Sequence, residues 1–302
     1  MALALALASV PGPVRGMAHQ APTTASQVAA LMRIDYGSKT GTDSDAKRDY
    51  LKSVPWDAVT GNGTSNLVAT AASEGVGDWP TPNLLKVRGG WRASPAGAAS
   101  ENHRMTAGAH WAAPAAGQSL YYRWYVRVII PNTYTVDPLT HPIQDGTNGS
   151  LTNWMWEVTN GTDGTWTCSY NVSGNGANAF PNNRWYVPDP LTKGVTYLFE
   201  HRIHRIATST FNLHVWVSSA AGGLLYDNDD IENANASAVL ASTPTLTFND
   251  VAALGGMQAG FNGLSGGVQA DYPPINLYYQ GAHAVSSAGR CGAYGGVVGE
   301  VA

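Results

Sequence analysis

Residues 194–219 read GVTYLFEHRIHRIATSTFNLHVWVSS, and this stretch decides the fold class. Apolar and polar side chains alternate with a period of two over residues 197–206 and again over 211–218, and the small polar sequence ATST separates the two runs. Such alternation is typical of two paired strands that bury one face of a sheet. The stretch therefore predicts a long hairpin with an apolar face and a polar face.

The polar face of this predicted hairpin differs from an ordinary solvated sheet surface. Instead of threonine, serine and lysine, it carries acidic, basic and indole side chains, namely Glu200, Arg202, His204, His214 and Trp216. Side chains of these types bind or process sugar chains. The face is therefore a candidate surface for binding a glycan or a protein partner.

The composition limits the class of protein. Charged residues make up 13% of the 302 residues and the formal net charge is -4, so the chain has no basic stripe to neutralise a phosphate backbone. The 10 Trp and 14 Tyr outnumber the 5 Phe, which suits sheet surfaces better than a helical core. The 34 Gly and 17 Pro indicate many turns between short strands. We expect an all-β, antiparallel β-sandwich and no nucleic acid partner.

Two further segments predict strands of the same kind. Residues 119–130, SLYYRWYVRVII, place Arg123, Tyr125 and Arg127 on the face opposite the apolar one. Residues 151–172 predict a hairpin around the turn-rich TNGTDG, with Glu157 on one face. Between these segments, residues 131–150 are rich in Pro, Gly and Asn, and predict a long irregular loop of the functional or lid-like kind.

The two ends of the chain lack the long period-two alternation of the central segments. The apolar run at the start is too short to span a bilayer. Ser26 is placed to cap a short helix over 27–34, and residues 45–53 are a second short helical candidate. We expect an N-terminal arm over residues 1–33, one jelly-roll domain over 34–290 and a glycine-rich tail over 291–302. We expect both end segments to pack against another surface.

Four pieces of the sequence, taken together, resemble the concanavalin A-like lectin/glucanase jelly rolls, particularly their LamG-like and polysaccharide-lyase-like branch. They are Asp35-Tyr36-Gly37, YYRWYVRVIIP at 121–131, the pair YLFEHRIHR and FNLHVWVSS at 197–205 and 211–219, and NLYYQGAHAVSS at 276–287. In the closing piece, Gln280 and Gly281 stand where that family often has an acidic pair. The likeness covers residues 34–290 as architecture, and one fold serves many functions.

The resemblance implies either glycan binding on a concave sheet or cleavage of acidic polysaccharides by β-elimination. Elimination needs a group that neutralises the uronate carboxylate, a base and an acid, and Arg, His and Tyr suit these roles. For a lyase the implied catalytic set is His204, Arg202, Arg123 and Tyr278. The family's ELR strand and its Gln-Ile-His triplet are not present.

A glucanase is disfavoured by the same comparison. Hydrolysis of a glycosidic bond takes two carboxylates at a fixed separation, and the ExDxE motif of the jelly-roll glucanases is missing. Glu157 and Glu200 are single carboxylates on separate predicted strands. They form a pair only if those strands are neighbours.

Several candidates also have purely structural interpretations. His201 shares the apolar face with Phe199, which favours a buried imidazole, and Glu200 is placed for a cross-strand ion pair with Arg202 or Arg123. The acidic cluster Asp227, Asp229 and Asp230 has oxygen ligands for Ca²⁺ but lacks the spacing of an EF-hand loop, so a solvated turn is favoured. Cys168 and Cys291 leave a disulfide, or two separate buried thiols, open. No other cofactor is expected.

The sequence thus favours a non-enzymatic jelly-roll protein of an extracellular or virion assembly, such as a phage capsid-decoration or tail-associated structural protein. The low charge, the Ala, Gly, Thr and Asn-rich texture and the missing catalytic motifs all support this interpretation. Glycan binding through the concave sheet is compatible with it. A polysaccharide lyase and a free carbohydrate-binding module are the alternatives. The expected partners are protein subunits and polysaccharide, at an extracellular or virion-surface location.

Overall fold

The structure is a computed structural model of the 302-residue chain. It describes residues 27–34, 58–60, 66–92, 99–100, 103–107, 111–133, 137–144, 153–173, 184–186, 189–207, 210–227, 232–233, 238–239, 245–247, 257–261, 263–265 and 272–300. Every pairing between two strands among these residues is antiparallel, one isolated bridge is parallel, and no helix occurs among them. The described part therefore contains no helix long and apolar enough to cross a membrane.

The larger of the two main sheets has ten strands, in the order β15-β14-β13-β7-β21-β4-β3, with β1 on β21, β18 on β14 and β5 on β4. Its strands are β1 (Met32–Ile34), β3 (Asn66–Thr70), β4 (Asn83–Arg92), β5 (Ala99–Ser100), β7 (Ser119–Val128), β13 (Tyr197–Arg205), β14 (Thr210–Ser219), β15 (Leu224–Tyr226), β18 (Thr245–Thr247) and β21 (Tyr272–Ser286).

The second main sheet has eight strands in the order β17-β16-β11-β10-β9-β8-β20, with β12 on β10. They are β8 (Asp137–Gln144), β9 (Asn153–Asn160), β10 (Thr165–Ser173), β11 (Arg184–Tyr186), β12 (Leu191–Thr192), β16 (Glu232–Asn233), β17 (Ala238–Val239) and β20 (Gly263–Ser265). A small third sheet joins β19 (Met257–Phe261), β6 (His103–Ala107) and β2 (Ala58–Thr60).

The predicted hairpin forms the middle of the ten-stranded sheet, as β13 and β14. Phe199 lies opposite Val217 on β14 and opposite Trp124 on β7, so these three side chains share one face. Glu200 lies opposite Trp216 and Arg123, which share the other face. Directly opposite residues point to the same side of a sheet, so the register confirms the alternation that the sequence predicted.

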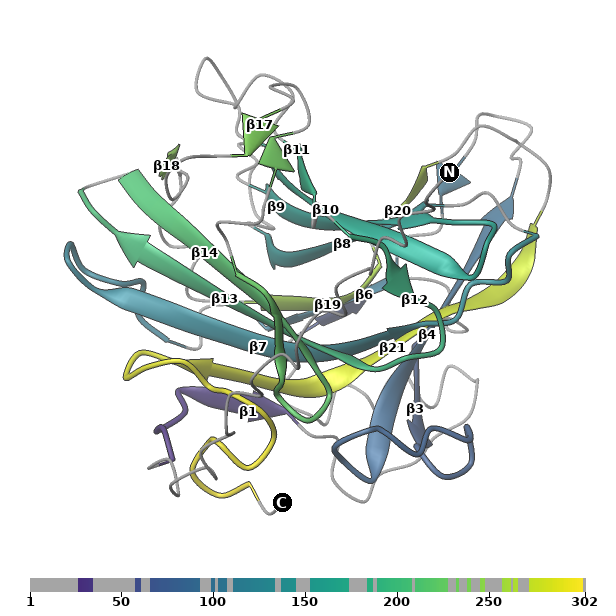
Figure 1. The fold of residues 1–302 in the computed structure, drawn as a ribbon, viewed down its shortest axis with the longest axis horizontal. Helices are drawn as coiled ribbons and strands as arrows, with labels where there is room; N and C mark the ends of the chain where they lie inside the picture. Colours follow the sequence, from purple (N-terminus) through teal and green to yellow (C-terminus); the bar gives the residue numbers. More distant parts are fainter. Residues whose placement is uncertain are drawn as a thin grey trace, which may run out of the picture.

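The two main sheets stack face to face, and the hydrophobic core lies between them (Figure 1). Trp166 of β10 packs against Phe199 and Tyr197 of β13, with ring centroids 6.1 and 6.0 Å apart, and Phe199 stacks on Trp124 at 5.9 Å. We call the face that carries Trp124 and Phe199 the inward face. Buried aromatic groups of this size dominate the energetics of a core, and the expected all-β jelly-roll sandwich is confirmed.

Two histidines are buried on the inward face. His201 lies 4.4 Å from the Trp124 ring, in an edge-to-face arrangement, and neither His201 nor His283 of β21 has exposed surface. Burial lowers the pKa of His201 well below its ordinary value, and burial together with the nearby charge of Arg123 lowers the pKa of His283 to about 3. Both imidazoles are therefore neutral near pH 7. The prediction that His201 is a buried imidazole is confirmed.

The last described residues cover the opposite face of the ten-stranded sheet. Residues 287–300, which we call the closing segment, leave β21 and fold back over the side that faces away from the eight-stranded sheet (Figure 1). Val297 of this segment forms a parallel bridge with Val28, and β1 pairs with β21 nearby. Described residues from near both ends of the chain thus pack against the same sheet. The division of the chain after residues 33 and 290 stays a prediction.

Two local expectations were wrong. Residues 27–34 form the Val28 bridge and strand β1 instead of a helix, because pairing with the long strand β21 buries Met32 and Ile34. Strand β8 occupies part of the predicted loop at 131–150, and its ladder with β9 shifts register between Thr140 and Ile143. A bulge tolerates a proline, which otherwise removes a ladder hydrogen bond. The helical candidate at 45–53 lies outside the described residues.

The neutral inward histidines predict a loss of stability in acid. An unfolded histidine takes up a proton near pH 6.5, whereas folded His283 does so only near pH 3, so the unfolded state binds more protons between these values. The free energy of unfolding should fall as the pH drops through this window. Replacing His283→Asn should flatten the fall by up to about 1.4 kcal/mol per pH unit. Urea unfolding at several pH values measures both slopes, and equal slopes would contradict the assignment.

Candidate functional site

The candidate site occupies the outward face of the ten-stranded sheet, which carries the polar side of the predicted hairpin. Three parts of this face differ in what lies over them. The closing segment covers the part around Arg123 and Glu200, and the connection between β3 and β4 covers the part around Arg127. In the part around the half-buried Arg202, neither of these two segments forms a hydrogen bond or ion pair with the arginine within the described residues. We call this last part the open part.

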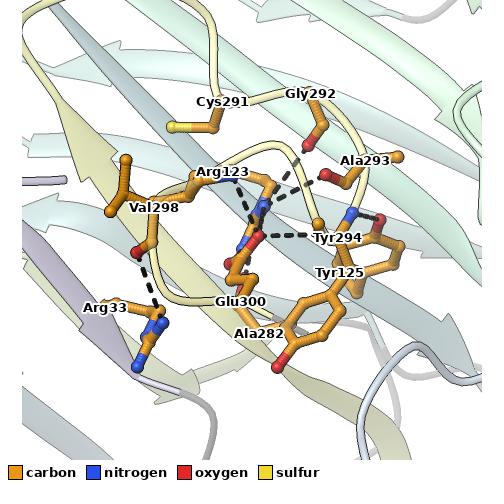
Figure 2. A network of polar contacts seen from close by, with 12 residues as sticks. Arg33, Arg123, Tyr125, Ala282, Cys291, Gly292, Ala293, Tyr294, Val298 and Glu300 are labelled. Atoms are coloured by element: carbon orange, nitrogen blue, oxygen red, sulfur yellow. Dashed lines mark hydrogen bonds and ion pairs between the residues drawn. The ribbon is translucent and has the colours of Figure 1, made fainter. Parts of the chain in front are cut away.

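Arg123 is the centre of the covered part. Its guanidinium forms a bidentate ion pair with the Glu300 carboxylate, through Nη1 at 3.0 Å and through Nη2, and neither side chain has exposed surface. Figure 2 shows the two groups facing each other beneath the loop of the closing segment. Burial disfavours the charged form of Arg123, but the hydrogen bond and charge of Glu300 outweigh it and raise the pKa of Arg123. Arg123 is thus held as a cation inside the protein.

The backbone completes the shell around this pair. Arg123 Nε donates to the carbonyl of Ala282 at 3.1 Å, and the amides of Gly295 and Val297 donate to the Glu300 carboxylate at 2.9 and 3.3 Å. Ala282 adopts a φ of 48°, in the left-handed region that an alanine enters at a cost of about 1–2 kcal/mol. It lies where the β21–β7 register shifts between Gly281 and Ala284, and this bulge directs its carbonyl at Arg123.

Tyr125 and Glu200 are held by the same segment. The amide of Tyr294 donates to the Tyr125 hydroxyl at 2.8 Å, and burial raises the pKa of Tyr125 to about 12. Glu200, which is buried, accepts hydrogen bonds from Arg290 Nε at 2.6 Å and from the Gly292 amide at 2.7 Å. The ion-pair partner of Glu200 is therefore Arg290, and the expected pair with Arg202 or Arg123 was wrong. Alternation along neighbouring strands gives no information about Arg290, which is ninety residues from Glu200 in the sequence.

The open part is centred on Arg202. Its strand neighbours in the same row are Tyr121 of β7 and His214 of β14, and all three side chains are half-buried. Arg202 Nε is buried without a hydrogen-bond partner, and Arg202 forms no ion pair within the described part of the chain. The other arginines of β7 and of the closing segment are each paired with an acid. An unsatisfied buried donor in a native structure calls for an explanation.

A tryptophan and two histidines lie near this arginine on the same face. His214 and Trp216 stack with ring centroids 4.0 Å apart, and His214 Nε2 pairs with the Asp227 carboxylate. On the other side, the Ser119 hydroxyl and His204 Nδ1 share a hydrogen bond of 2.9 Å. This bond fixes the orientation of the imidazole. The arrangement offers a cation, aromatic surface and imidazole groups to a ligand.

The structure separates the residues named for a lyase. Arg202 and His204 lie on the open part, but Arg123 is beneath the closing segment. Tyr278 lies opposite Val128 and Val87, so it points to the inward face, and it is fully buried. Register explains the position of Tyr278, because side chains on opposite faces of one sheet cannot converge on one substrate. Arg123 shares the face of Arg202 and is separated from it by its pairing with Glu300.

The remaining candidates are placed as follows. Arg127 pairs with Asp78 at 2.5 Å under the β3–β4 connection. Only the backbone of Glu157 is described, in β9 of the eight-stranded sheet, whereas Glu200 belongs to the ten-stranded sheet, so their strands are not neighbours and the condition for a carboxylate pair is not met.

Metal and thiol chemistry find little support in the described residues. Asp227 contacts His214, while Asp229 and Asp230 lie outside the described residues, and among those described no group of three or more His, Cys, Asp or Glu side chains is placed to hold a metal ion. The favoured solvated turn and the alternative Ca²⁺ site at these residues are both untested by the described part of the chain. Cys168 and Cys291 are both buried, and they do not form a disulfide with each other.

Sequence reasoning missed three residues of this face. Tyr121 is two residues before Arg123 and shares its face, but it was not among the candidates. Arg290 and Glu300 lie in a glycine-rich segment without periodicity, so no local pattern connects them to the sheet. Only the fold brings them to Glu200 and Arg123.

No protein-family model and no curated protein matches this sequence. Similar solved structures include a variant of the alginate lyase Aly36B in complex with an alginate trisaccharide, with a TM-score of 0.45 and 13% identity over 87% of this chain and 99% of that one. The endo-β-1,4-glucuronan lyase of the fungus Trichoderma reesei has a TM-score of 0.44 and 12% identity, over 86% of this chain and 96% of that one.

A third similar structure is the conserved carbohydrate esterase of the Shiga toxin-encoding bacteriophage phi24B, with a TM-score of 0.40 and 14% identity over 87% of this chain and 100% of that one. Polysaccharide lyases are thus among the structures that this chain resembles, as the sequence pattern predicted. The likeness concerns the arrangement of strands and assigns no role to any residue.

The buried ion pair predicts a large effect from a small change. Replacing Glu300→Gln leaves the Arg123 charge buried without a counter-charge, which should lower the free energy of unfolding by roughly 3–5 kcal/mol. The matched change Asp78→Asn removes the more exposed pair with Arg127 and should cost at most about 1 kcal/mol. Urea denaturation followed by tryptophan fluorescence measures both. Equal losses would show that the Glu300 pair is not buried in solution.

Proposed function

We propose that this chain is a non-enzymatic jelly-roll protein of an extracellular or virion assembly, and that it binds an acidic polysaccharide through the open part of its outward face. The observation that carries the binding proposal is Arg202, a half-buried arginine without an acidic partner in the described part of the chain. A carboxylate of the ligand supplies the missing partner.

The surroundings of Arg202 support a sugar ligand over a simple anion. The guanidinium is a planar fork that matches a carboxylate with two parallel hydrogen bonds. Tyr121 and His214 flank it in the same row of the sheet, and Trp216 adjoins His214. Aromatic rings provide apolar surface for the faces of a sugar ring, while His204 adds an oriented polar group.

The separation of the four residues named for β-elimination favours binding over cleavage. Tyr278 points to the inward face and is buried, and Arg123 lies under the closing segment. Elimination is the second candidate because Tyr121 of β7 lies directly opposite Arg202 of β13. His204 is two residues after Arg202 on β13 and shares its face. These three residues have the types that neutralise, abstract and donate in that reaction.

The assembly part of the proposal draws on the edge of the ten-stranded sheet. β15 is the edge strand there, and Leu224 and Leu225 are 53% and 47% exposed. An exposed apolar edge strand is a surface that other chains pair with, and soluble monomers usually protect such edges. The low charge of the chain, 13% of its residues, is consistent with subunit contacts.

Binding is tested with a panel of acidic and neutral polysaccharides. The wild-type protein should bind a polyuronate and not a neutral glucan of similar length, by isothermal titration calorimetry. Replacing Arg202→Gln should weaken binding roughly 10- to 100-fold, because a charge-assisted bidentate contact contributes about 1.5–3 kcal/mol. The control Arg33→Gln removes the same charge from an exposed arginine of β1 and should leave the affinity unchanged.

Two results would overturn this proposal. If no acidic polymer binds, or if Arg202→Gln binds as tightly as the wild type, the site is wrong. If ultraviolet absorbance from an unsaturated sugar grows during incubation and is lost in His204→Ala, the protein is a lyase and not a binding protein.

Assembly is tested separately. The purified protein should form oligomers or particles in multi-angle light scattering, and Leu225→Asp should shift it towards monomers because it places a charge on the β15 edge. The control is Ile206→Asp, which changes an exposed apolar residue away from that edge. A monodisperse wild-type monomer at all concentrations would exclude the assembly part.

A further inference from the structure

A second arginine reaches the open part from the closing segment. Arg290 Nε donates to Glu200 at 2.6 Å, and the Arg290 Cζ lies 4.7 Å from the centre of the Trp216 ring. Its side chain is 35% exposed. Glu200 and Trp216 thus orient the guanidinium while leaving part of it in contact with solvent.

Most of the hydrogen-bonding capacity of Arg290 is unused. An arginine carries five N–H donors, and only the one on Nε has a partner within the described part of the chain. The four donors on Nη1 and Nη2 form the fork that binds a carboxylate with two hydrogen bonds. Glu200 is already engaged by Nε and by the Gly292 amide, so it orients Arg290 without occupying this fork.

The position of Arg290 relative to Arg202 is set by strand β13. Glu200, which anchors Arg290, is two residues before Arg202 on the same face, and two residues of a strand span about 6.6 Å. The stacked pair of His214 and Trp216 runs alongside, opposite Arg202 and Glu200. The Arg290 guanidinium therefore lies over the row of Glu200 and Trp216, next to the row that carries Arg202 and His214.

We infer that the open part binds two carboxylates at once, one on Arg202 and one on Arg290, and that its ligand is a polymer with a carboxylate on successive sugar residues. This inference rests on the proposed function and specifies its ligand. An acidic polysaccharide with widely spaced charges meets only one of the two arginines, so it binds more weakly.

The same arrangement couples the ligand to the closing segment. Arg290 belongs to that segment, and the adjacent residues Cys291 and Gly292 are packed against the sheet, with Cys291 only 1% exposed. A ligand that contacts Arg290 only when the segment is docked stabilises the docked state by mass action. Ligand binding therefore clamps the closing segment onto the sheet.

The thiol of Cys291 reports this clamp. It reacts with a maleimide only when the segment lifts, because burial hides the thiol and raises its pKa to about 12. A saturating polyuronate should slow labelling of Cys291 roughly 10-fold, the factor that contact with Arg290 adds to the affinity, because the ligand still binds Arg202 when the segment lifts. Peptide mass spectrometry separates Cys291 from Cys168, whose labelling requires opening of the core and serves as the internal reference.

The affinity test uses two disaccharides that differ in one group, one with a carboxylate on both sugars and one with a carboxylate on a single sugar. The wild type should prefer the first roughly 10-fold or more. Arg290→Gln should abolish this preference, and Arg290→Lys should restore part of it, because lysine keeps the charge and loses the fork. A purely structural role for Arg290 would change stability and leave the preference intact.

The outcomes are distinct. If the doubly charged disaccharide binds through Arg202 but the preference survives Arg290→Gln, the two-carboxylate site is wrong and the proposed function stands. Faster labelling of Cys291 in the presence of ligand would show that the ligand displaces the segment, which overturns the clamp. If neither disaccharide nor the polymer binds the wild-type protein, the proposed function fails and this inference fails with it.

Discussion

The charge of Arg123 is the constraint around which the outward face is built. Arg123 lies on β7, in the middle of the ten-stranded sheet, where neighbouring strands leave it little access to water. A buried guanidinium is costly unless a counter-charge and hydrogen bonds satisfy it. Glu300 and the carbonyl of Ala282 supply both, so the closing segment has to pack on this sheet. The left-handed alanine at the bulge is a further cost of directing that carbonyl.

Once the closing segment is in place, it divides the face into parts with different uses. It removes Arg123, Tyr125 and Glu200 from contact with a ligand in this conformation, and it brings Arg290 to Trp216. Glu300, which neutralises Arg123, and Arg290, which neutralises Glu200, both belong to the closing segment, residues 287–300. Structural pairing and ligand binding are therefore linked through one segment, although they use different side chains.

The inward face shows how the same residue types behave in a different environment. His201 and His283 share the space between the sheets with Trp124, and burial keeps both imidazoles neutral. His204 is on the same strand as His201 but on the other face, where it is half-buried and contacts Ser119. Two histidines three residues apart thus serve the core and the surface because a strand alternates its side chains.

The sequence by itself determined three central strands, β7, β13 and β14, and the two faces of each, because a period of two is a local property that survives in any sheet. It also indicated a recognition or packing surface on the hairpin. Only the tertiary structure decided which of those residues stay open. Tyr278 and Arg202 look equivalent along the chain, but register sends them to opposite faces. Arg290 and Glu300 meet their partners across 90 and 177 residues, and a non-periodic, glycine-rich segment gives no local signal of such contacts.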